Sequence, residues 1–160
     1  MERLQAGRTA PRMINVELGE LLAHPIATAQ LAAKAKGLSL RADYDPHTLL
    51  WADPELAAAS VTNVLDNAVK YTDRGEIRVA SELGANEVSL HVWDNCPGLS
   101  EQELGIIFEP FERGHSNKPG SGIGLAVARR AIEAQGGTIG AESSGERGCH
   151  FWLALPRAAH

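Results

Sequence analysis

The feature that most constrains the fold is a pair of predicted β-hairpins separated by a helix-forming stretch. Residues 76–83 and 87–93 alternate apolar and polar side chains, and residues 84–86 between them supply turn residues. Residues 138–142 and 149–155 repeat this pattern around a second turn that contains glycine. Because hairpin strands pair antiparallel, the sequence predicts a sheet that is mostly antiparallel.

Helical patterns fill most of the remaining chain. Apolar residues recur at helical spacing over residues 18–36, and Gly37 ends that run. A second helix is predicted from Asp53 to about Tyr71, and a third over residues 122–135. Further short strands are expected at residues 13–17, 38–42 and 48–51. These elements predict an α+β fold, a two-layer α/β sandwich in which three main helices cover one face of a mixed sheet.

The length of 160 residues suits one compact domain, which we expect over residues 12–157 with a tail at 158–160. Residues 1–8 have the pattern of a helix end, stopped by Gly7 and Pro11, which indicates a piece of a longer chain. No apolar run approaches the ~20 residues that a membrane helix needs, and the start lacks a signal-peptide core. We therefore expect a cytoplasmic fragment without membrane contact, and the location of the parent stays open.

Charge and cysteine spacing exclude two classes of function. The net charge of -5 comes without a basic cluster, which argues against a nucleic-acid partner. Cys96 and Cys149 lie far apart and lack metal-ligand spacing. We expect them to be two free thiols, each buried as a small apolar side chain.

The helix that starts at Asp53 carries the most informative polar residues. Asp53, Pro54 and Glu55 form a strong helix start. At 100° per residue, Asn63, Asn67 and Lys70 fall on one face, opposite the apolar residues Val61, Val64, Leu65 and Ala68. Such a face is either solvated or ligand-binding. Asparagine costs about 0.5 kcal/mol relative to alanine inside a helix, and amide oxygens suit Mg²⁺, so both interpretations stay open.

Two further segments have the chemistry of a nucleotide site. Asp94 follows a strand and precedes Pro97 and Gly98, so its carboxylate can meet an amine of a flat heterocycle, although an ordinary turn has the same pattern. The run from Gly120 to Leu125 precedes a helix, where glycines let phosphates approach backbone N–H groups. This run is neither a dinucleotide fingerprint nor a P-loop.

Four motifs in this order resemble the N, G1, F and G2 boxes of sensor histidine kinases over about residues 18–156. They are Asn63-x3-Asn67-x2-Lys70-Tyr71, Asp94-x3-Gly98, Phe108-x2-Phe111 and Gly120-x-Gly122-x-Gly124-Leu125. The resemblance implies the ATP-binding fold that these kinases share with gyrase, mismatch-repair and heat-shock-chaperone ATPases. It also implies ATP and Mg²⁺ as cofactors, and it makes residues 1–11 a remnant of the preceding dimerisation helix and its linker.

The resemblance assigns the N and G1 boxes to the metal and the base. Asn67 would coordinate Mg²⁺ with Asn63 nearby, and Lys70 and Tyr71 would contact the phosphate and ribose side. Asp94 would bind the adenine amine.

The remaining boxes concern the loop that covers the nucleotide. Gly98 would let the ring pack, Phe108 and Phe111 would anchor the loop, and Arg113 could reach phosphates. Gly120, Gly122 and Gly124, followed by Leu125, would form its hinge.

Position 63 separates the activities within this fold. Hydrolytic relatives carry a glutamate there as general base for water, whereas this chain has Asn63. The resemblance therefore implies that the γ-phosphoryl group passes to a histidine on a separate dimerisation and phosphoacceptor domain, with a response regulator as an indirect partner. A hydrolytic ATPase and a degenerate interaction domain are the alternatives.

Histidines and cysteines complete the expectations. His24, the most tempting of the six histidines, lacks the flanking residues of the family's phosphoacceptor, and we expect all six to be surface or partly packed residues. We therefore expect little turnover from the isolated chain. Cys96 and Cys149 stand where the family usually has glycine and threonine. Both positions line the adenine side, so we hypothesise that the two sulfurs flank the base.

Overall fold

The computed structural model describes residues 10–95, 102, 107–108, 121–143 and 148–158. Their elements, each within one residue of its expected bounds, are β1 (Ile14–Glu17), α2 (Leu18–Ala35), β2 (Ser39–Asp43), β3 (Leu49–Ala52), α3 (Pro54–Tyr71), β4 (Glu76–Leu83), β5 (Glu87–Asp94), α5 (Ser121–Ala134), β6 (Thr138–Ser143) and β7 (Cys149–Pro156). Periodicity and turn chemistry therefore located the elements correctly.

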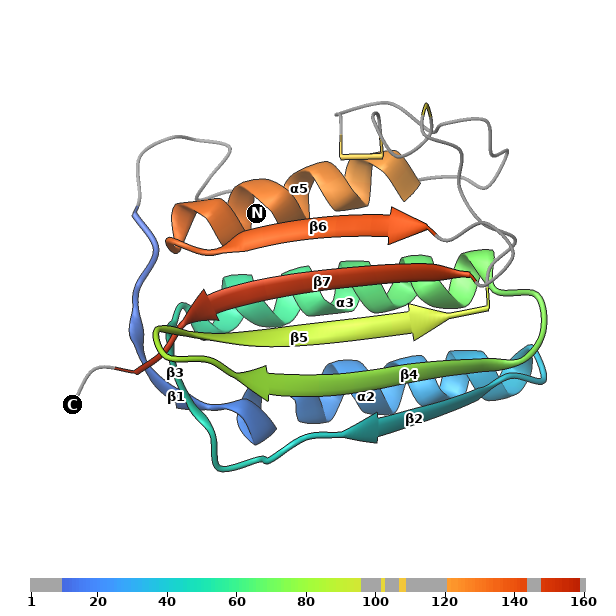
Figure 1. The fold of residues 1–160 in the computed structure, drawn as a ribbon, viewed down its shortest axis with the longest axis horizontal. Helices are drawn as coiled ribbons and strands as arrows, with labels where there is room; N and C mark the ends of the chain where they lie inside the picture. The colour runs from blue at the N-terminus through green and yellow to red at the C-terminus, as the bar shows by residue number, and fades with distance from the viewer. Residues whose placement is uncertain (1–9, 96–101, 103–106, 109–120, 144–147, 159–160) are drawn as a thin grey trace.

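Five strands form the main sheet in the order β2-β4-β5-β7-β6. Only β2 and β4 pair parallel, and the other neighbours pair antiparallel. Helices α2, α3 and α5 lie side by side behind this sheet (Figure 1). The expected α+β sandwich is confirmed. One arrangement was not expected: β1 and β3 form a separate two-stranded antiparallel sheet.

The core lies between the helices and the sheet, and strand alternation explains its composition. In β5, Val88, Leu90 and Val92 are buried, whereas Ser89 and His91 on the opposite face are half-buried. On the helix side these strand residues pack with apolar residues of the helices, including Leu22, Leu65 and Ile132, which are at most 1% exposed. One face of the sheet is thus committed to the core, and the other carries no helix among the described elements.

Helix α3 is held at both ends by residues distant in sequence. At its start, Asp53 accepts a hydrogen bond from the backbone N–H of Leu56 at 3.1 Å and another from that of Arg12 at 2.9 Å. The backbone N–H of Asp53 donates to Gln135 Oε1 at 2.8 Å. At its end, Lys36 Nζ donates to the carbonyl oxygen of Val69 at 2.7 Å. The helix that carries the candidate ligands is therefore fixed in place.

Among the described segments, no helix combines the length and apolar character needed to cross a bilayer.

Candidate functional site

The C-terminal ends of α3 and β5 and the starts of α5 and β7 gather at one end of the sandwich, on the right in Figure 1. This arrangement follows from strand direction, because β5 and β7 are antiparallel neighbours and Asp94 pairs with Cys149 at their shared end. Helices α3 and α5 pack against each other behind these strands. Three of the four sequence motifs therefore converge from separate parts of the chain.

Asn67 is the most informative residue at this end. Its side chain is buried, at 4% exposure, and its Nδ2 donates to the carbonyl oxygen of Asn63 at 2.8 Å. Only the NH₂ group of an amide can donate to a carbonyl, so this bond directs Oδ1 the other way. Within the part of the chain that the structure describes, Oδ1 is buried and has no hydrogen-bond partner.

Of the two interpretations left open for the face of Asn63, Asn67 and Lys70, a solvated face does not describe Asn67. Asn63 and Lys70 are half-buried, whereas Asn67 lies inside the fold. Helical geometry explains the difference, because Asn67 is only 60° from buried Val64 around the axis and α3 is packed on both flanks by α2 and α5. The apolar face of a helix covered on three sides is wider than its residue types indicate.

An unpartnered buried amide oxygen fits a hard cation. Leaving such a group without a partner costs about 1–3 kcal/mol, whereas Mg²⁺ prefers oxygen donors. No group of three or more histidine, cysteine or carboxylate residues in the described ranges could hold a metal ion. A single amide oxygen suits a cation that takes few protein ligands and completes its shell with water and phosphate oxygens, as Mg²⁺ does.

Thr72 is a candidate residue that the sequence analysis missed. It is fully buried directly after α3, and its backbone N–H caps the helix by donating to Ala68 O at 3.1 Å. Its Oγ1 has no hydrogen-bond partner among the described residues. A threonine at a helix end resembles an ordinary cap, so only its position next to Lys70 and Tyr71 could have indicated a ligand contact.

Asp94 lies at the mouth of a hollow at the same end of the sheet. The carboxylate is 4% exposed, and the hollow of about 540 Å³ is lined by Trp93, Asp94, Glu142, Ser143, Gly148, Cys149 and His150. Gly148 has a φ of +104°, and a Cβ there would collide with the carbonyl oxygen of Asp94. Glycine thus lets β7 begin against the backbone of Asp94.

The chain leaving β5 is fixed by Asn95. Its Oδ1 accepts a hydrogen bond from the backbone N–H of Glu76, the first residue of β4, at 2.7 Å. This contact ties the end of β5 to the start of its neighbour and so holds the backbone next to Asp94.

The other site residues expected from the sequence lie in different environments, and some lie outside the described residues. Lys70 and Tyr71 are half-buried at the end of α3, and Phe108 is half-buried against the core. Leu125 is fully buried in the core, so its side chain packs the fold. Gly122 and Gly124 lie in the first turn of α5, which begins one residue earlier than expected. Gly98, Phe111, Arg113 and Gly120 lie outside the described residues.

Asp66 lies on the exposed side of α3, beside Asn67 in sequence. Partial burial raises the pKa of its carboxyl group, and the positive charge of Lys70 one turn away lowers it in part. The residue points away from Asn67 around the helix, so it is a surface acid of α3.

Cys149 corrects one expectation. It is disulfide-bonded, so the prediction of two free thiols is wrong. Cys149 is also buried and lines the hollow with Asp94, and the hypothesis of a sulfur beside the base stays a prediction. Cys96, the other cysteine of the sequence, lies outside the described residues.

Comparison with known proteins identifies the class of domain. A family model described as histidine kinase-, DNA gyrase B- and HSP90-like ATPase matches residues 52–159. The chain belongs to this family.

Individual relatives narrow the class. Sensor protein KdpD of Escherichia coli K12 is 38% identical over 71% of this chain and 13% of KdpD. Sensor histidine kinase AruS of Pseudomonas aeruginosa is 32% identical over 98% of this chain and 17% of AruS. The crystal structure of full-length ShkA in complex with AMPPNP matches with a TM-score of 0.84 and 26% identity, over 98% of this chain and 34% of ShkA. The expected resemblance to a sensor histidine kinase catalytic domain is confirmed, and the chain spans less than a fifth of these two curated relatives.

Proposed function

We propose that this chain binds Mg²⁺-ATP and donates the γ-phosphoryl group to a histidine on the dimerisation and phosphoacceptor domain of a longer kinase. The observation that carries the proposal is Asn67 Oδ1, a buried amide oxygen with no partner in the described part of the chain. A buried amide oxygen that is left without a protein partner is the kind of ligand that a nucleotide-bound cation requires. The relatives are sensor kinases, which supports the same conclusion.

Different residues would contact different parts of the nucleotide. Asp94, buried at the end of β5, would accept a hydrogen bond from the exocyclic amine of adenine. Thr72 Oγ1 would hydrogen-bond the ligand on the same side. Lys70 and Tyr71 at the end of α3 would contact the phosphates and ribose. Arg113 is a further candidate for the phosphates, and the loop between β5 and α5 would cover the ligand.

Phosphoryl transfer in such a site depends on positioning and on charge neutralisation. When bound, Mg²⁺ would neutralise the phosphate oxygens and hold them in a fixed orientation. The protein contributes a fixed helix: Lys36 holds the C-terminal end of α3 through the carbonyl oxygens of Val69 and Lys70, at 2.7 and 3.2 Å. The candidate phosphate ligands therefore stand on a restrained backbone.

Asn63 makes hydrolysis the weaker alternative. A neutral amide cannot take a proton from water at pH 7, so the position where hydrolytic relatives carry a glutamate base offers none. The phosphoryl group is then held for a stronger nucleophile such as imidazole. A response regulator would receive it afterwards. The proposal also includes a cytoplasmic location for this fragment, without a nucleic-acid partner and without direct contact with the membrane.

The proposal assigns the acceptor role to none of the histidines in the described residues. His24 is exposed on α2, His47 is exposed before β3, and His91 and His150 lie on the sheet face opposite the helices. The acceptor is therefore expected on another domain. We further propose that residues 1–11 belong to the helix and linker preceding residues 12–157, with a short tail at 158–160.

Two measurements test the proposal. Calorimetric titration with AMP-PNP should show binding that weakens strongly when Mg²⁺ is removed. Incubation with γ-labelled ATP should leave the isolated chain unlabelled and release little phosphate. Rapid phosphate release would instead establish a hydrolytic ATPase, absence of AMP-PNP binding would indicate an interaction module, and stoichiometric acid-labile labelling would show an acceptor within the chain.

A further inference from the structure

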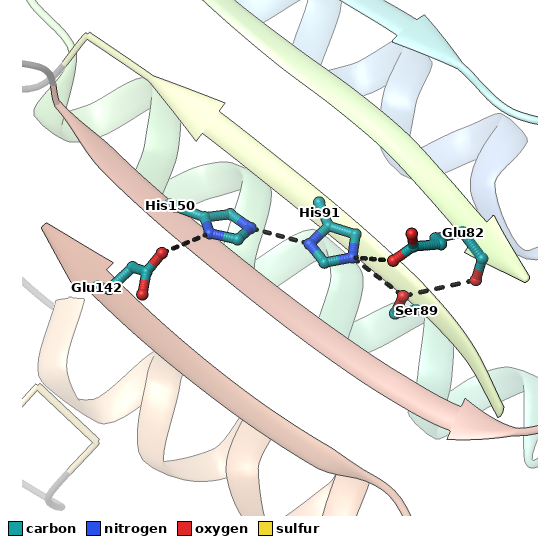
Figure 2. A network of polar contacts seen from close by, with 5 residues as sticks. All are labelled: Glu82, Ser89, His91, Glu142 and His150. Carbon is teal, nitrogen blue, oxygen red and sulfur yellow. Dashed lines mark hydrogen bonds and ion pairs between the residues drawn. The ribbon is translucent and has the colours of Figure 1, made fainter. Parts of the chain in front are cut away.

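A pair of histidines joins β5 to β7 on the sheet face that carries no helix. His91 Nδ1 lies 2.9 Å from His150 Nε2, within hydrogen-bond distance (Figure 2). The side chains are only 19% and 21% exposed, although the face is open. Two imidazoles in direct contact share a single N–H···N bond, so their protonation states depend on each other.

Polar side chains on both sides extend this pair across four strands (Figure 2). Glu142 on β6 meets His150 Nδ1 at 3.2 Å. On the other side, Ser89 Oγ lies 3.0 Å and Glu82 Oε1 3.7 Å from His91 Nε2. The outer nitrogen of each ring thus faces an oxygen, and the inner nitrogens face each other.

The donors and acceptors of the two histidines and their neighbours limit how many protons the pair can hold. With both rings neutral, Ser89 donates to His91, His91 donates to His150, and His150 donates to Glu142. One extra proton is also accommodated, because a charged ring donates on both sides and its neutral partner still offers one lone pair. A second extra proton places two N–H groups and two positive charges against each other at 2.9 Å. The contact must then break.

Aromatic neighbours restrict rotation of the two rings. Trp93 stacks on His91 and on His150, with centroid separations of 5.5 and 5.0 Å, and Trp152 packs against His150 at 5.4 Å. Arg78 lies over Trp93 at 5.7 Å and adds a further positive charge on this face. Gly140 on β6 leaves room for Trp152, since a Cβ there would overlap its ring. Restricted rotation favours relief of the repulsion by movement of the strands.

The surroundings of His91 lower the pKa of its imidazole. Burial is the main cause that lowers its pKa, the charge of His150 lowers it further, and Glu82 raises it in part. As pH falls below the ordinary histidine value of about 6.5, the unfolded chain takes up protons that the folded chain resists. The unfolded state then binds more protons, so stability is present above about pH 6.5 and decreases as pH falls through this range.

The pair lies near the candidate adenine carboxylate along the β5–β7 ladder, but on the opposite face of the sheet. In the pairing of β5 with β7, Trp93 lies opposite His150, and the next pair is Asp94 with Cys149. Strand alternation directs the histidines to the open face and Asp94 to the helix side. Asp94 belongs to the residue pair next to that of His150. A separation of the strands at His150 would therefore also move Asp94.

We propose that His91 and His150 form a pH-sensitive clamp that holds β5 against β7 and releases on double protonation, lowering nucleotide affinity in acid. The link to nucleotide affinity depends on the function proposed above, whereas the clamp itself does not. A proton rather than a metal ion is the natural occupant, because the described residues include no group of three or more histidine, cysteine or carboxylate side chains able to hold a metal.

Nuclear magnetic resonance tests the clamp without any nucleotide. The imidazole signals of the wild-type chain are followed between pH 8.5 and 5, together with those of His91→Gln, His150→Gln and the control His24→Gln, which removes an exposed histidine of α2. We expect His91 and His150 to titrate in two coupled steps in the wild type and in the control. In each clamp variant the remaining histidine should titrate in one step. Independent titration of both rings in the wild type, at the midpoint of His24, would overturn the clamp.

The dissociation constant of AMP-PNP with saturating Mg²⁺, measured on the same four proteins at pH 8 and pH 5.5, tests the link to the site. A proton that the bound state excludes changes this constant by up to about tenfold per pH unit. We expect a tenfold or larger weakening at pH 5.5 in the wild type and the control, and a clearly smaller one in both clamp variants. Protonation of the ligand acts equally on all four proteins and cancels in the comparison. Equal weakening in all four would refute the link, whereas failure to bind at pH 8 would refute the proposed function and leave the NMR result standing.

Discussion

Replacement of Asn67 by alanine is the sharpest test of the site, because structure and ligand binding should respond in different directions. Truncation removes the Nδ2 hydrogen bond to Asn63 O, which is worth about 1 kcal/mol, and some packing, worth about 1 kcal/mol. The carbonyl oxygen of Asn63 is not left unsatisfied, because an amide of the following helical turn also donates to it. These losses are the whole structural cost.

Two gains oppose that cost. Alanine is favoured over asparagine within a helix by about 0.5 kcal/mol. Removal of the unpartnered Oδ1 relieves a penalty of about 1–3 kcal/mol. The net effect lies between a loss of about 0.5 and a gain of about 1.5 kcal/mol, which shifts Tm by only a few degrees in a domain of this size. The apo protein should therefore be as stable as the wild type, or slightly more stable.

Asp53→Ala is the matched control, since Asp53 is equally buried at the other end of α3 but fully engaged. It accepts from Leu56 N and Arg12 N, so its loss should cost about 2 kcal/mol and lower Tm by about 4–8 °C.

Thermal unfolding with and without Mg²⁺-AMP-PNP distinguishes the two variants. Ligand at a hundred times its dissociation constant should stabilise the wild type by about 2.7 kcal/mol, and Asp53→Ala should keep most of this gain. Asn67→Ala should lose the Mg²⁺-dependent part. The reasoning fails if Asn67→Ala unfolds as early as Asp53→Ala, or if it retains the full ligand shift.

Two further substitutions test how the site is supported. Lys36→Met removes the Nζ contacts to the carbonyl oxygens of Val69 and Lys70, so it should cost about 1 kcal/mol in urea unfolding and weaken AMP-PNP binding. Lys34→Met, in the last turn of α2, should do neither. Equal effects of the two substitutions would contradict a specific contact. Gly140→Ala places a Cβ where the ring of Trp152 lies, so it should lower the free energy of unfolding by about 1–3 kcal/mol and alter the near-UV circular dichroism of tryptophan. Thr138→Ala, at an exposed position of the same strand, should do neither. An unchanged spectrum for Gly140→Ala would show that Trp152 does not pack there.

Local sequence patterns predicted the elements well and their long-range relations poorly. Hairpin turns and helix caps depend on neighbouring residues, so the bounds of α3, β4 and β5 could be derived. The parallel pairing of β2 with β4 and the separation of β1 and β3 into a second sheet depend on tertiary packing, which no short window contains.

The same limit applied to the site. Asn67, Lys70 and Asp94 were selected by residue type and spacing, but the burial of Asn67 depended on helices that flank α3 from both sides. Strand alternation places His91 on the open face. Its contact with His150, 59 positions further along the chain, depends on the register of β5 against β7. Thr72 was missed because its hydroxyl is informative only once it is known to be buried without a partner among the described residues.

The hydrogen bonds at the start of α3 have a consequence for how the chain acquires its structure during synthesis. The backbone N–H of Asp53 meets a side chain 82 residues downstream, and its carboxylate meets a backbone group 41 residues upstream. Contacts of such sequence separation pay a large loop-closure entropy and form late. A nascent chain cannot complete the start of its ligand-bearing helix until Gln135 has left the ribosome. Nucleotide competence should therefore arise in one late, cooperative step, leaving no partly synthesised intermediate able to capture ATP.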